Sequence, residues 1–371
     1  MTLAFSEEQE ALRENVRRFL QDKATESEVR RLMATEEGYD ESVWKFMADA
    51  LGLQSLAIPE EFGGQGFGLV EQYIVFEEMG AALFGGPFFA TVALAAGALI
   101  ESDDDAAKAS YLPGIASGDT IATLAYQDDS GSFDLDKTST KASADGDAWK
   151  ISGAKNYVVD GNNASLILVT AETGKGLSLF AVDGDATGLS RTNLPTLDQT
   201  RKQSRLEFTN TPARLIGTDG GADAWLTVAL QKACVLLSAE EAGGADKVLA
   251  AAVEYAKNRV QFDRPIASFQ AIKHMCADMM VEVESTKSLA SYAAWAGEES
   301  TDELAVMSST AKSYCSEAFF HCASQNIQIH GGIGYTWEHP AHLYFKRAKS
   351  SEIMLGDPSY HRELLLEGLG V

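Results

Sequence analysis

The period of the hydrophobic pattern changes twice along this chain of 371 residues, and this change limits the folds that it can adopt. Residues 1–118 and 223–371 place apolar side chains at helical spacing, as Leu12, Val16 and Phe19 do. Residues 119–222 instead carry short alternating runs separated by turn residues, which is the pattern of β-strands. We therefore predict an α+β fold with an N-terminal helical domain, a middle β domain and a C-terminal helical bundle.

Individual elements can be predicted from the same pattern. In the N-terminal part, helices are predicted at 41–51, 70–84 and 88–101. In the middle part, strands are predicted at 121–126, 149–152, 165–170, 177–182 and 205–208.

Charge and composition narrow the possible partners. The chain has 54 Asp and Glu residues against 30 Lys and Arg, and its formal net charge is -24. Such a surface repels nucleic-acid phosphates and anionic membranes, so we expect neither as a partner. No apolar run is long enough to span a membrane, and the four cysteines lack metal-ligand spacing. We therefore predict a soluble cytoplasmic protein with free thiols and no metal site.

Several motifs carry a resemblance to a known family. Residues 328–335 read QIHGGIGY, residues 344–347 read YFKR, and residues 355–357 read LGD. Residues 255–262 read YAKNRVQF, and residues 149–155 read WKISGAK. Together these motifs resemble acyl-CoA dehydrogenases over nearly the whole chain. The resemblance implies FAD as cofactor, an acyl-CoA substrate, a middle domain that is a β-barrel or sandwich, and a C-terminal four-helix bundle.

The resemblance implies that one half of the flavin site is intact. In the family each FAD lies at a subunit interface, so that one chain supplies halves of two sites. Arg259 offers a planar fork of donors for the pyrophosphate, and an ion pair with Glu254 or Asp263 is the alternative. Phe262 is expected beside the dinucleotide, with packing in the core as the alternative. The other residues implied for this half are Gln270, Gln328, Gly331 and Gly332.

The half implied for the flavin ring departs from the family pattern. Ser132 matches a family serine, but the threonine and proline of the family pattern are absent from the preceding residues YQDDSG at 126–131, where an extra acidic residue stands. Tyr157 stands where an aromatic residue stacks on the flavin, and it retains that capacity. Val159 replaces a threonine and so lacks the hydroxyl donor.

The catalytic glutamate of the family is absent from both of its known positions. Leu355 occupies the loop position and Ala233 the helix position, where Cys234 also replaces an arginine. Glu240 lies about two helical turns beyond Ala233, on the same face, and is the candidate substitute base. The alternative for Glu240 and its neighbour Glu241 is a structural role, paired with Lys247 or facing solvent.

Three interpretations follow, and we favour the first. The chain is a companion subunit of a hetero-oligomeric acyl-CoA dehydrogenase, and its partner carries the base. Its C-terminal region also resembles the small subunits of bacterial pimeloyl-CoA and steroid side-chain enzymes. Alternatively, it is a complete homo-oligomeric enzyme, a dimer or tetramer, that uses Glu240 as base. The third is a flavin-free scaffold or binding protein on the same fold. For the two enzyme interpretations, the resemblance implies an electron-transferring flavoprotein as electron acceptor.

Overall fold

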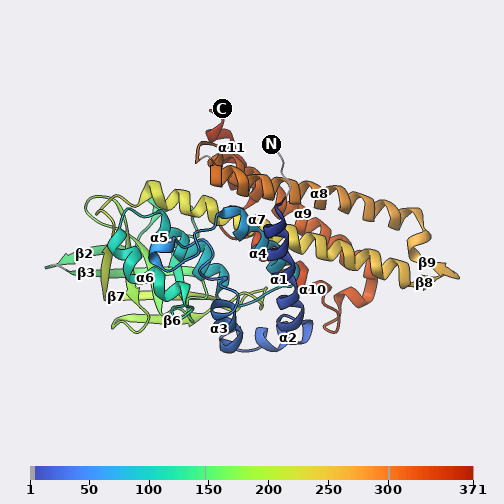
Figure 1. Ribbon diagram of the computed structural model, residues 1–371, viewed down its shortest axis with the longest axis horizontal. Helices are drawn as coiled ribbons and strands as arrows, with labels where there is room; N and C mark the ends of the chain where they lie inside the picture. The colour runs from blue at the N-terminus through green and yellow to red at the C-terminus, as the bar shows by residue number, and fades with distance from the viewer. Residues whose placement is uncertain (1–4, 147, 300, 371) are drawn as a thin grey trace. The chain divides into compact units, whose positions relative to one another are not determined.

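The computed structural model describes residues 5–146, 148–299 and 301–370 (Figure 1). The chain divides into two compact units that interleave along the sequence. The helical unit comprises 1–30, 69–84 and 234–371, and the mixed unit comprises 31–68 and 85–233. Within the described residues, no helix has the length and apolarity that a membrane span requires. The predicted α+β fold is confirmed.

The helical unit is built from long antiparallel helices. Ser6 and Gln9 begin the first helix with a reciprocal capping box, in which each side chain accepts from the other's backbone N–H (3.2 and 2.9 Å). The helices are α1 (Glu7–Lys23), α4 (Leu69–Ala81), α7 (Asp223–Asn258, which begins in the mixed unit), α8 (Gln270–Glu299), α9 (Thr301–His330), α10 (Ala341–Ile353) and α11 (Pro358–Gly368). A short helix, α2 (Glu26–Met33), crosses the boundary between the two units.

Two glycines allow α4 and α7 to cross with their backbones in contact. A Cβ atom on Gly80 of α4 would lie 2.0 Å from the carbonyl oxygen of Glu240. A Cβ on Gly243 of α7 would lie 1.8 Å from the carbonyl oxygen of Glu77. No side chain fits at either position, so this crossing depends on glycine. The crossing fixes the part of α7 that carries Glu240.

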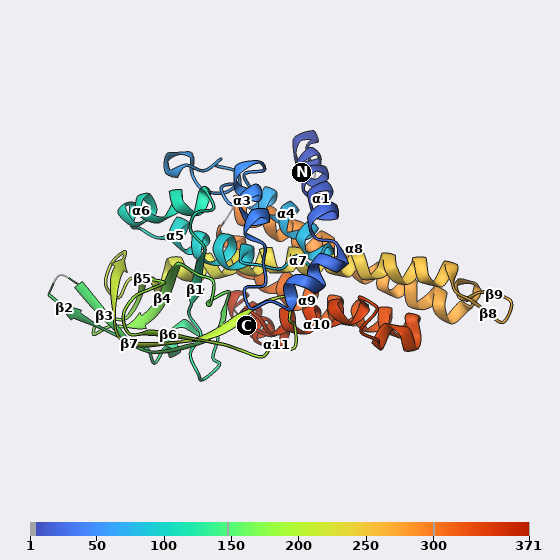
Figure 2. The same ribbon diagram turned by 90° about the horizontal axis from the view of Figure 1, so that it is seen from below.

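The end of α7, the start of α8 and the end of α9 share one end of the helical unit. Between α7 and α8 the chain forms a small hairpin, β8 (Val260–Gln261) and β9 (Arg264–Pro265), followed by the 3₁₀ turn η4 (Ile266–Ser268). The views in Figures 1 and 2 place this hairpin at the outer tip of the α7–α8 pair. After α9, the 3₁₀ turn η5 (Gly331–Tyr335) continues at the same end.

The mixed unit contains a seven-stranded sheet that closes on itself. The strands are β1 (Ala122–Ala125), β2 (Lys141–Asp145), β3 (Ala148–Val159), β4 (Leu166–Glu172), β5 (Leu177–Asp183), β6 (Leu189–Asn193) and β7 (Gln203–Ile216). They pair in the order β1-β4-β2-β3-β7-β5, and β5 pairs back with β4. This closed ring of strands is barrel-like, as the family resemblance implied. A further strand, β6, extends the sheet by pairing with β7.

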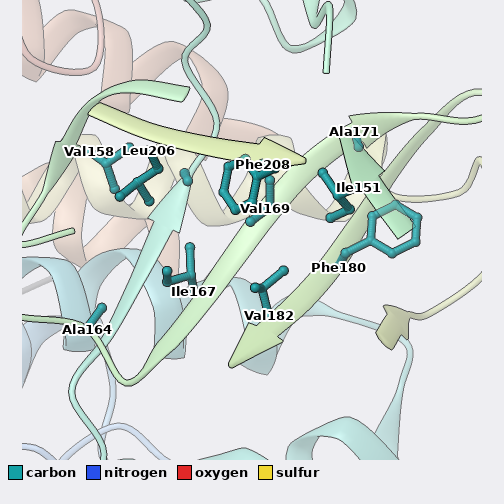
Figure 3. Close-up of a cluster of buried hydrophobic side chains, with 11 residues drawn as sticks. Ile151, Val158, Ala164, Ile167, Val169, Ala171, Phe180, Val182, Leu206 and Phe208 are labelled. Atoms are coloured by element: carbon teal, nitrogen blue, oxygen red, sulfur yellow. The ribbon is translucent and has the colours of Figure 1, made fainter. Parts of the chain in front are cut away.

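Inward-facing side chains of the sheet form a compact apolar core (Figure 3). Its members are fully or almost fully buried, and they include Ile151, Val169, Phe180, Leu206 and Phe208. Helical elements complete the unit: α3 (Glu41–Asp49), η1 (Glu60–Phe62), η2 (Phe89–Ala96), α5 (Gly97–Glu101), α6 (Asp105–Ala116) and η3 (Leu135–Lys137). The single helix predicted at 88–101 is wrong in detail, because Phe89–Ala96 is π-helical and only Gly97–Glu101 is α-helical.

Candidate functional site

One group of predicted residues lies at the hairpin end of the helical unit. Arg259 follows the last residue of α7, and its N–H donates to the carbonyl of Tyr255 (2.8 Å). Phe262 lies in the turn between β8 and β9, with a φ of +52° and 85% of its surface exposed. Its ring lies at right angles to that of Phe269, with 6.0 Å between centroids. Phe262 is therefore not a core residue in this chain, and its apolar surface is open to a ligand or a partner.

The remaining predicted residues of this group are also exposed. Gln270 is the first residue of α8, and Gln328 lies in the last turn of α9. Gly331 has a φ of +65°, which favours glycine. A Cβ atom on Gly331 or Gly332 would meet no atom within 4 Å, so the space beside this backbone is open. The turn thus leaves room for close approach of a ligand.

A buried histidine anchors that glycine turn. The Nδ1–H of His330 donates to the carbonyl of Asn326 (2.8 Å), and its ring stacks on Tyr255 with centroids 4.2 Å apart. The ring of His339 also packs against the ring of His330, with 4.3 Å between their centroids. Burial lowers the pKa of His330, so the ring is neutral near pH 7. Throughout the described ranges, no group of His, Cys, Asp and Glu residues has the arrangement of a metal site.

The guanidinium of Arg259 remains available for an anion. Glu254, one of its two possible ion-pair partners, accepts a hydrogen bond from the amide of Asn258 instead (2.5 Å). Neither Glu254 nor Asp263 forms an ion pair with Arg259 in the structure as described. The other arginine of the hairpin, Arg264, lies over the ring of Phe269, 4.1 Å from its centroid. The predicted ion pair of Arg259 is therefore not observed, and an anionic ligand fits this position.

The residues predicted for the flavin ring lie in the mixed unit. The register between β3 and β7 shifts between Lys155 and Val158, a β-bulge that places Tyr157 outside the regular ladder. Tyr157 has a φ of +54° and is 50% exposed, so its ring can stack on a ligand. Val159 is buried and offers no donor. Ser132 is partly buried in the loop that links β1 and β2.

The acidic residue gained in that loop belongs to a buried ion pair. The ammonium group of Lys155 contacts the carboxylate of Asp128, and it also donates to the carbonyl of Tyr126 (3.1 Å) and the hydroxyl of Thr138 (2.8 Å). Burial lowers the pKa of Lys155 to about 8, while Asp128 opposes the shift. Lys155 is therefore protonated at pH 7 and the pair is ionic. Asp128 holds the loop together and presents no exposed charge.

Neither position at which the family resemblance places a base carries a proton acceptor. Ala233 is fully buried within α7. Cys234, beside it, has its pKa raised to about 12 by burial and stays a thiol. Leu355 lies in the turn between α10 and α11, is buried, and has a φ of +63°. The carbonyl of Leu355 accepts a hydrogen bond from Nε2 of His361 (3.0 Å).

The candidate substitute base is buried beside an arginine. Glu240 is 6% exposed, and its Oε2 lies 3.9 Å from Nη1 of Arg347 on α10. Glu241 is fully buried and accepts a hydrogen bond from the hydroxyl of Ser316 (2.8 Å). The alternative roles predicted for the two glutamates, exposure or pairing with Lys247, are wrong within the described residues. Glu240 is therefore held in the interior beside the guanidinium of Arg347.

Three basic residues of α10, Lys346, Arg347 and Lys349, make contacts with other residues of the helical unit. The ammonium of Lys346 lies over the ring of Trp337, 4.3 Å from its centroid. Lys349 pairs with Glu352 at 3.0 Å, and Arg347 lies beside Glu240 in the interior. Each positive charge thus has a local contact. Sequence reasoning did not find the contact of Arg347 with Glu240, because these two residues are far apart in the chain. It also did not identify Lys312 and His361 as buried residues.

Three family models match successive parts of the chain. The acyl-CoA dehydrogenase N-terminal domain matches residues 6–119, the middle domain residues 123–211, and the C-terminal domain residues 220–370. This chain belongs to the acyl-CoA dehydrogenase family. It is therefore related to oxidoreductases that act on acyl-CoA thioesters.

Proteins similar to this acyl-CoA dehydrogenase chain include one named a steroid ACAD and one named as a complex of two chains. Acyl-CoA dehydrogenase IpdE2 of Mycobacterium tuberculosis is 36% identical over 359 residues, covering 97% of this chain and 95% of the relative. A structure of a variant of the Tcur3481–Tcur3483 steroid ACAD is 32% identical, with a TM-score of 0.89, and covers 100% of this chain and 99% of that one. The ChsE4–ChsE5 complex from Mycobacterium tuberculosis is 29% identical, with a TM-score of 0.89 and the same coverage.

FAD is the cofactor of acyl-CoA dehydrogenases, and the hairpin end of the helical unit fits part of it. The donor fork of Arg259 suits a pyrophosphate, and the open backbone at Gly331 and Gly332 leaves space for the nucleotide. In the mixed unit, Tyr157 retains a surface on which a ring can stack. Val159 lacks the hydroxyl that the family uses there, so the fit is better at the nucleotide end than at the ring end.

Proposed function

We propose that this chain is the companion subunit of a hetero-oligomeric acyl-CoA dehydrogenase. It binds the pyrophosphate and adenine of FAD through Arg259, Phe262 and Gln328, while the partner subunit supplies the catalytic base. One observation carries the proposal: Leu355 and Ala233 occupy both base positions, whereas the hairpin end keeps its donors exposed.

The surroundings of Glu240 support this assignment over a complete enzyme. A general base must accept a proton and reach the hydrogen on the α carbon of the thioester. Glu240 instead lies beside Arg347 in the interior, and its helix is locked against α4 at Gly80. We therefore assign Glu240 a structural role and place the proton transfer on the partner.

The reaction that the assembly performs is α,β-dehydrogenation of an acyl-CoA thioester. A carboxylate of the partner would remove the proton on the α carbon, and bound FAD would supply the acceptor for the β hydrogen and its electron pair. An electron-transferring flavoprotein then accepts the two electrons. Two relatives point to bulky substrates and mixed assemblies, since one is named a steroid ACAD and another a complex of two different chains. We propose a cytoplasmic location.

A flavin absorbance spectrum tests the proposal. The chain is purified alone and after co-expression with an acyl-CoA dehydrogenase chain that carries the catalytic glutamate, and each sample is titrated with a steroid-derived and a linear acyl-CoA. We expect flavin colour, and its bleaching by acyl-CoA, only in the co-expressed assembly. If the chain purified alone is yellow and is bleached by acyl-CoA, it is a complete enzyme. If both samples are colourless, the chain is a flavin-free protein.

A further inference from the structure

Three polar residues line one buried face of α9. Ser309, Lys312 and Ser316 are spaced three and four residues apart, so they lie on the same side of the helix. Their exposed fractions are 4%, 0% and 0%. Burying a lysine costs free energy unless its charge is paired and its protons are hydrogen-bonded. The contacts of this polar face therefore indicate what it holds in place.

Lys312 binds the end of α10. Its Nζ donates to the carbonyls of Ser351 (3.0 Å) and Glu352 (3.2 Å), which belong to the last turn of that helix. Carbonyls in a last turn lack partners within the helix, and a helix C-terminus carries partial negative charge. The ammonium group therefore satisfies these acceptors and fixes the point at which α10 stops.

A glutamate on α7 balances the charge of Lys312. The hydroxyl of Ser316 accepts from Lys312 (2.8 Å) and donates to Oε1 of Glu241 (2.8 Å). The direct distance between Nζ of Lys312 and Oε1 of Glu241 is 4.0 Å. This chain of contacts joins α7, α9 and the end of α10 inside the helical unit.

The turn after α10 is held by a histidine of α11. Nε2 of His361 lies 3.0 Å from the carbonyl of Leu355, and Nδ1 lies 3.5 Å from the hydroxyl of Ser309. Because a carbonyl only accepts, Nε2 carries the hydrogen and Nδ1 faces the serine as an acceptor. A Cβ on Gly356 would lie 2.9 Å from Nε2 of His361, so glycine leaves the space that the imidazole needs.

The backbone of this turn needs such support. Leu355 has a φ of +63°, a conformation that costs a residue other than glycine about 1 kcal/mol. Asp357 adds a second constraint by capping α11, since its carboxylate accepts from the N–H of Tyr360 (2.8 Å). A strained backbone conformation persists only where surrounding contacts hold it in place. Here Lys312 binds the chain before the turn, and His361 and Asp357 bind it within and after the turn.

We infer that Ser309, Lys312 and His361 are positioning residues, which hold residue 355 in one backbone conformation. Position 355 is where the family resemblance places the catalytic base. In this chain the contacts of Ser309, Lys312 and His361 instead position a leucine, whose side chain cannot accept a proton. Any catalytic consequence rests on the proposed function, in which the partner performs the proton transfer. The positioning itself is a property of this chain alone.

The arrangement requires His361 to be neutral. Burial and the nearby charge of Lys312 lower the pKa of His361 to about 4, while the hydrogen bond to Leu355 and the charge of Asp357 oppose this shift. A second proton, on Nδ1, would remove the acceptor that faces Ser309 and add a positive charge near Lys312. Glu241 is on the far side of Lys312, where Ser316 joins the two.

Two substitutions of His361 test the hydrogen bond to residue 355. His361→Gln keeps an N–H donor on a side chain of similar length, whereas His361→Leu removes it. Hydrogen exchange of residues 350–358 is followed by mass spectrometry on the purified full chain. We expect about tenfold faster exchange in His361→Leu, and exchange close to that of the wild type in His361→Gln. Equal exchange in all three proteins would overturn the inference.

A substitution of Lys312 provides a second test that a purely structural role would not satisfy. The pKa of His361 is measured by NMR of histidine-labelled protein. Lys312→Met should raise it by about one unit, because the neighbouring charge is gone. Lys287→Met is the matched control, since Lys287 pairs with Asp246 elsewhere in the helical unit (2.6 Å). An unchanged pKa of His361 in Lys312→Met would show that the two residues do not act together.

Both measurements can fail independently of the proposed function. Neither needs flavin, acyl-CoA or a partner chain, so their results concern only how the turn is held. A colourless protein in the flavin experiment would leave them interpretable.

Discussion

Glu240 and Arg347 form a buried ion pair, and this pairing predicts how a substitution at Glu240 behaves. Glu240→Gln removes the carboxylate charge beside the buried guanidinium of Arg347, which costs about 3 kcal/mol. We expect a lower free energy of unfolding in urea, but normal turnover in the co-expressed assembly. Glu254→Gln, on the exposed side of α7, is the matched control and should change neither quantity. A folded Glu240→Gln assembly without turnover would make Glu240 the base.

His361 also predicts a dependence of stability on pH. Its pKa is about 4 in the folded chain and about 6.5 when unfolded, so the unfolded chain binds more protons between these values. The contribution of His361 to the free energy of unfolding is thus fully present above pH 6.5. It is lost as the pH falls through 4, by about 3 kcal/mol in total. His361→Gln lacks this component. The measurement is the difference in unfolding free energy between the two proteins across pH 7 to 4, and a constant difference would contradict the expectation.

At the scale of the elements, the crossing of α4 and α7 is the feature most sensitive to a single methyl group. Gly243→Ala would place a carbon 1.8 Å from the carbonyl oxygen of Glu77, so the helices must separate. We expect a loss of about 3 kcal/mol in unfolding free energy. Gly97→Ala is the control, because its nearest neighbouring atom is 4.0 Å away and alanine favours helix by about 1 kcal/mol. Similar stability of the two variants would show that the crossing can relax.

The elements also show what the sequence could and could not reveal. The buried strands β4 and β5 were predicted because their runs are apolar, whereas β2 and β6 were missed because none of their residues is buried. The π-helical Phe89–Ala96 was missed because its composition is that of an ordinary buried helix. The strand predicted at 149–152 is longer in the structure, where β3 spans Ala148–Val159. The prediction ended early because the register shifts after Ile151 and after Lys155 interrupt the alternating pattern.

The same distinction applies to the candidate site. Local motifs were sufficient to propose Arg259, Gly331 and Gly332, because each lies within a short run of residues that resembles a family motif. The surroundings of Glu240 depend on Arg347, and those of Asp128 depend on Lys155. Such pairs are set by tertiary packing, which no local pattern contains. The sequence therefore supplied candidates, and only the structure supplied their partners.

At the scale of the whole molecule, charge affects which partner is favourable. Two copies of a chain with a net charge of -24 repel each other at long range, and a less acidic partner reduces this repulsion. The exposed ring of Phe262 and the uncompensated guanidinium of Arg259 are at the same end of the helical unit. An apolar and a cationic group exposed together suit an interface shared with another subunit and an anionic ligand.

The companion role can be tested by comparing how substitutions at the nucleotide end and at the ring end of the predicted flavin site change FAD occupancy. A companion subunit uses its nucleotide end only, so Arg259→Ala should lower FAD occupancy of the co-expressed assembly. The loss of charge-assisted hydrogen bonds, about 2 kcal/mol, corresponds to roughly 30-fold weaker binding. Tyr157→Ala, at the ring end of the same chain, should leave occupancy unchanged. Arg264→Ala controls for charge on the hairpin. In a homo-oligomer every chain contributes both ends, so a loss of flavin in both Arg259→Ala and Tyr157→Ala would reject the companion role.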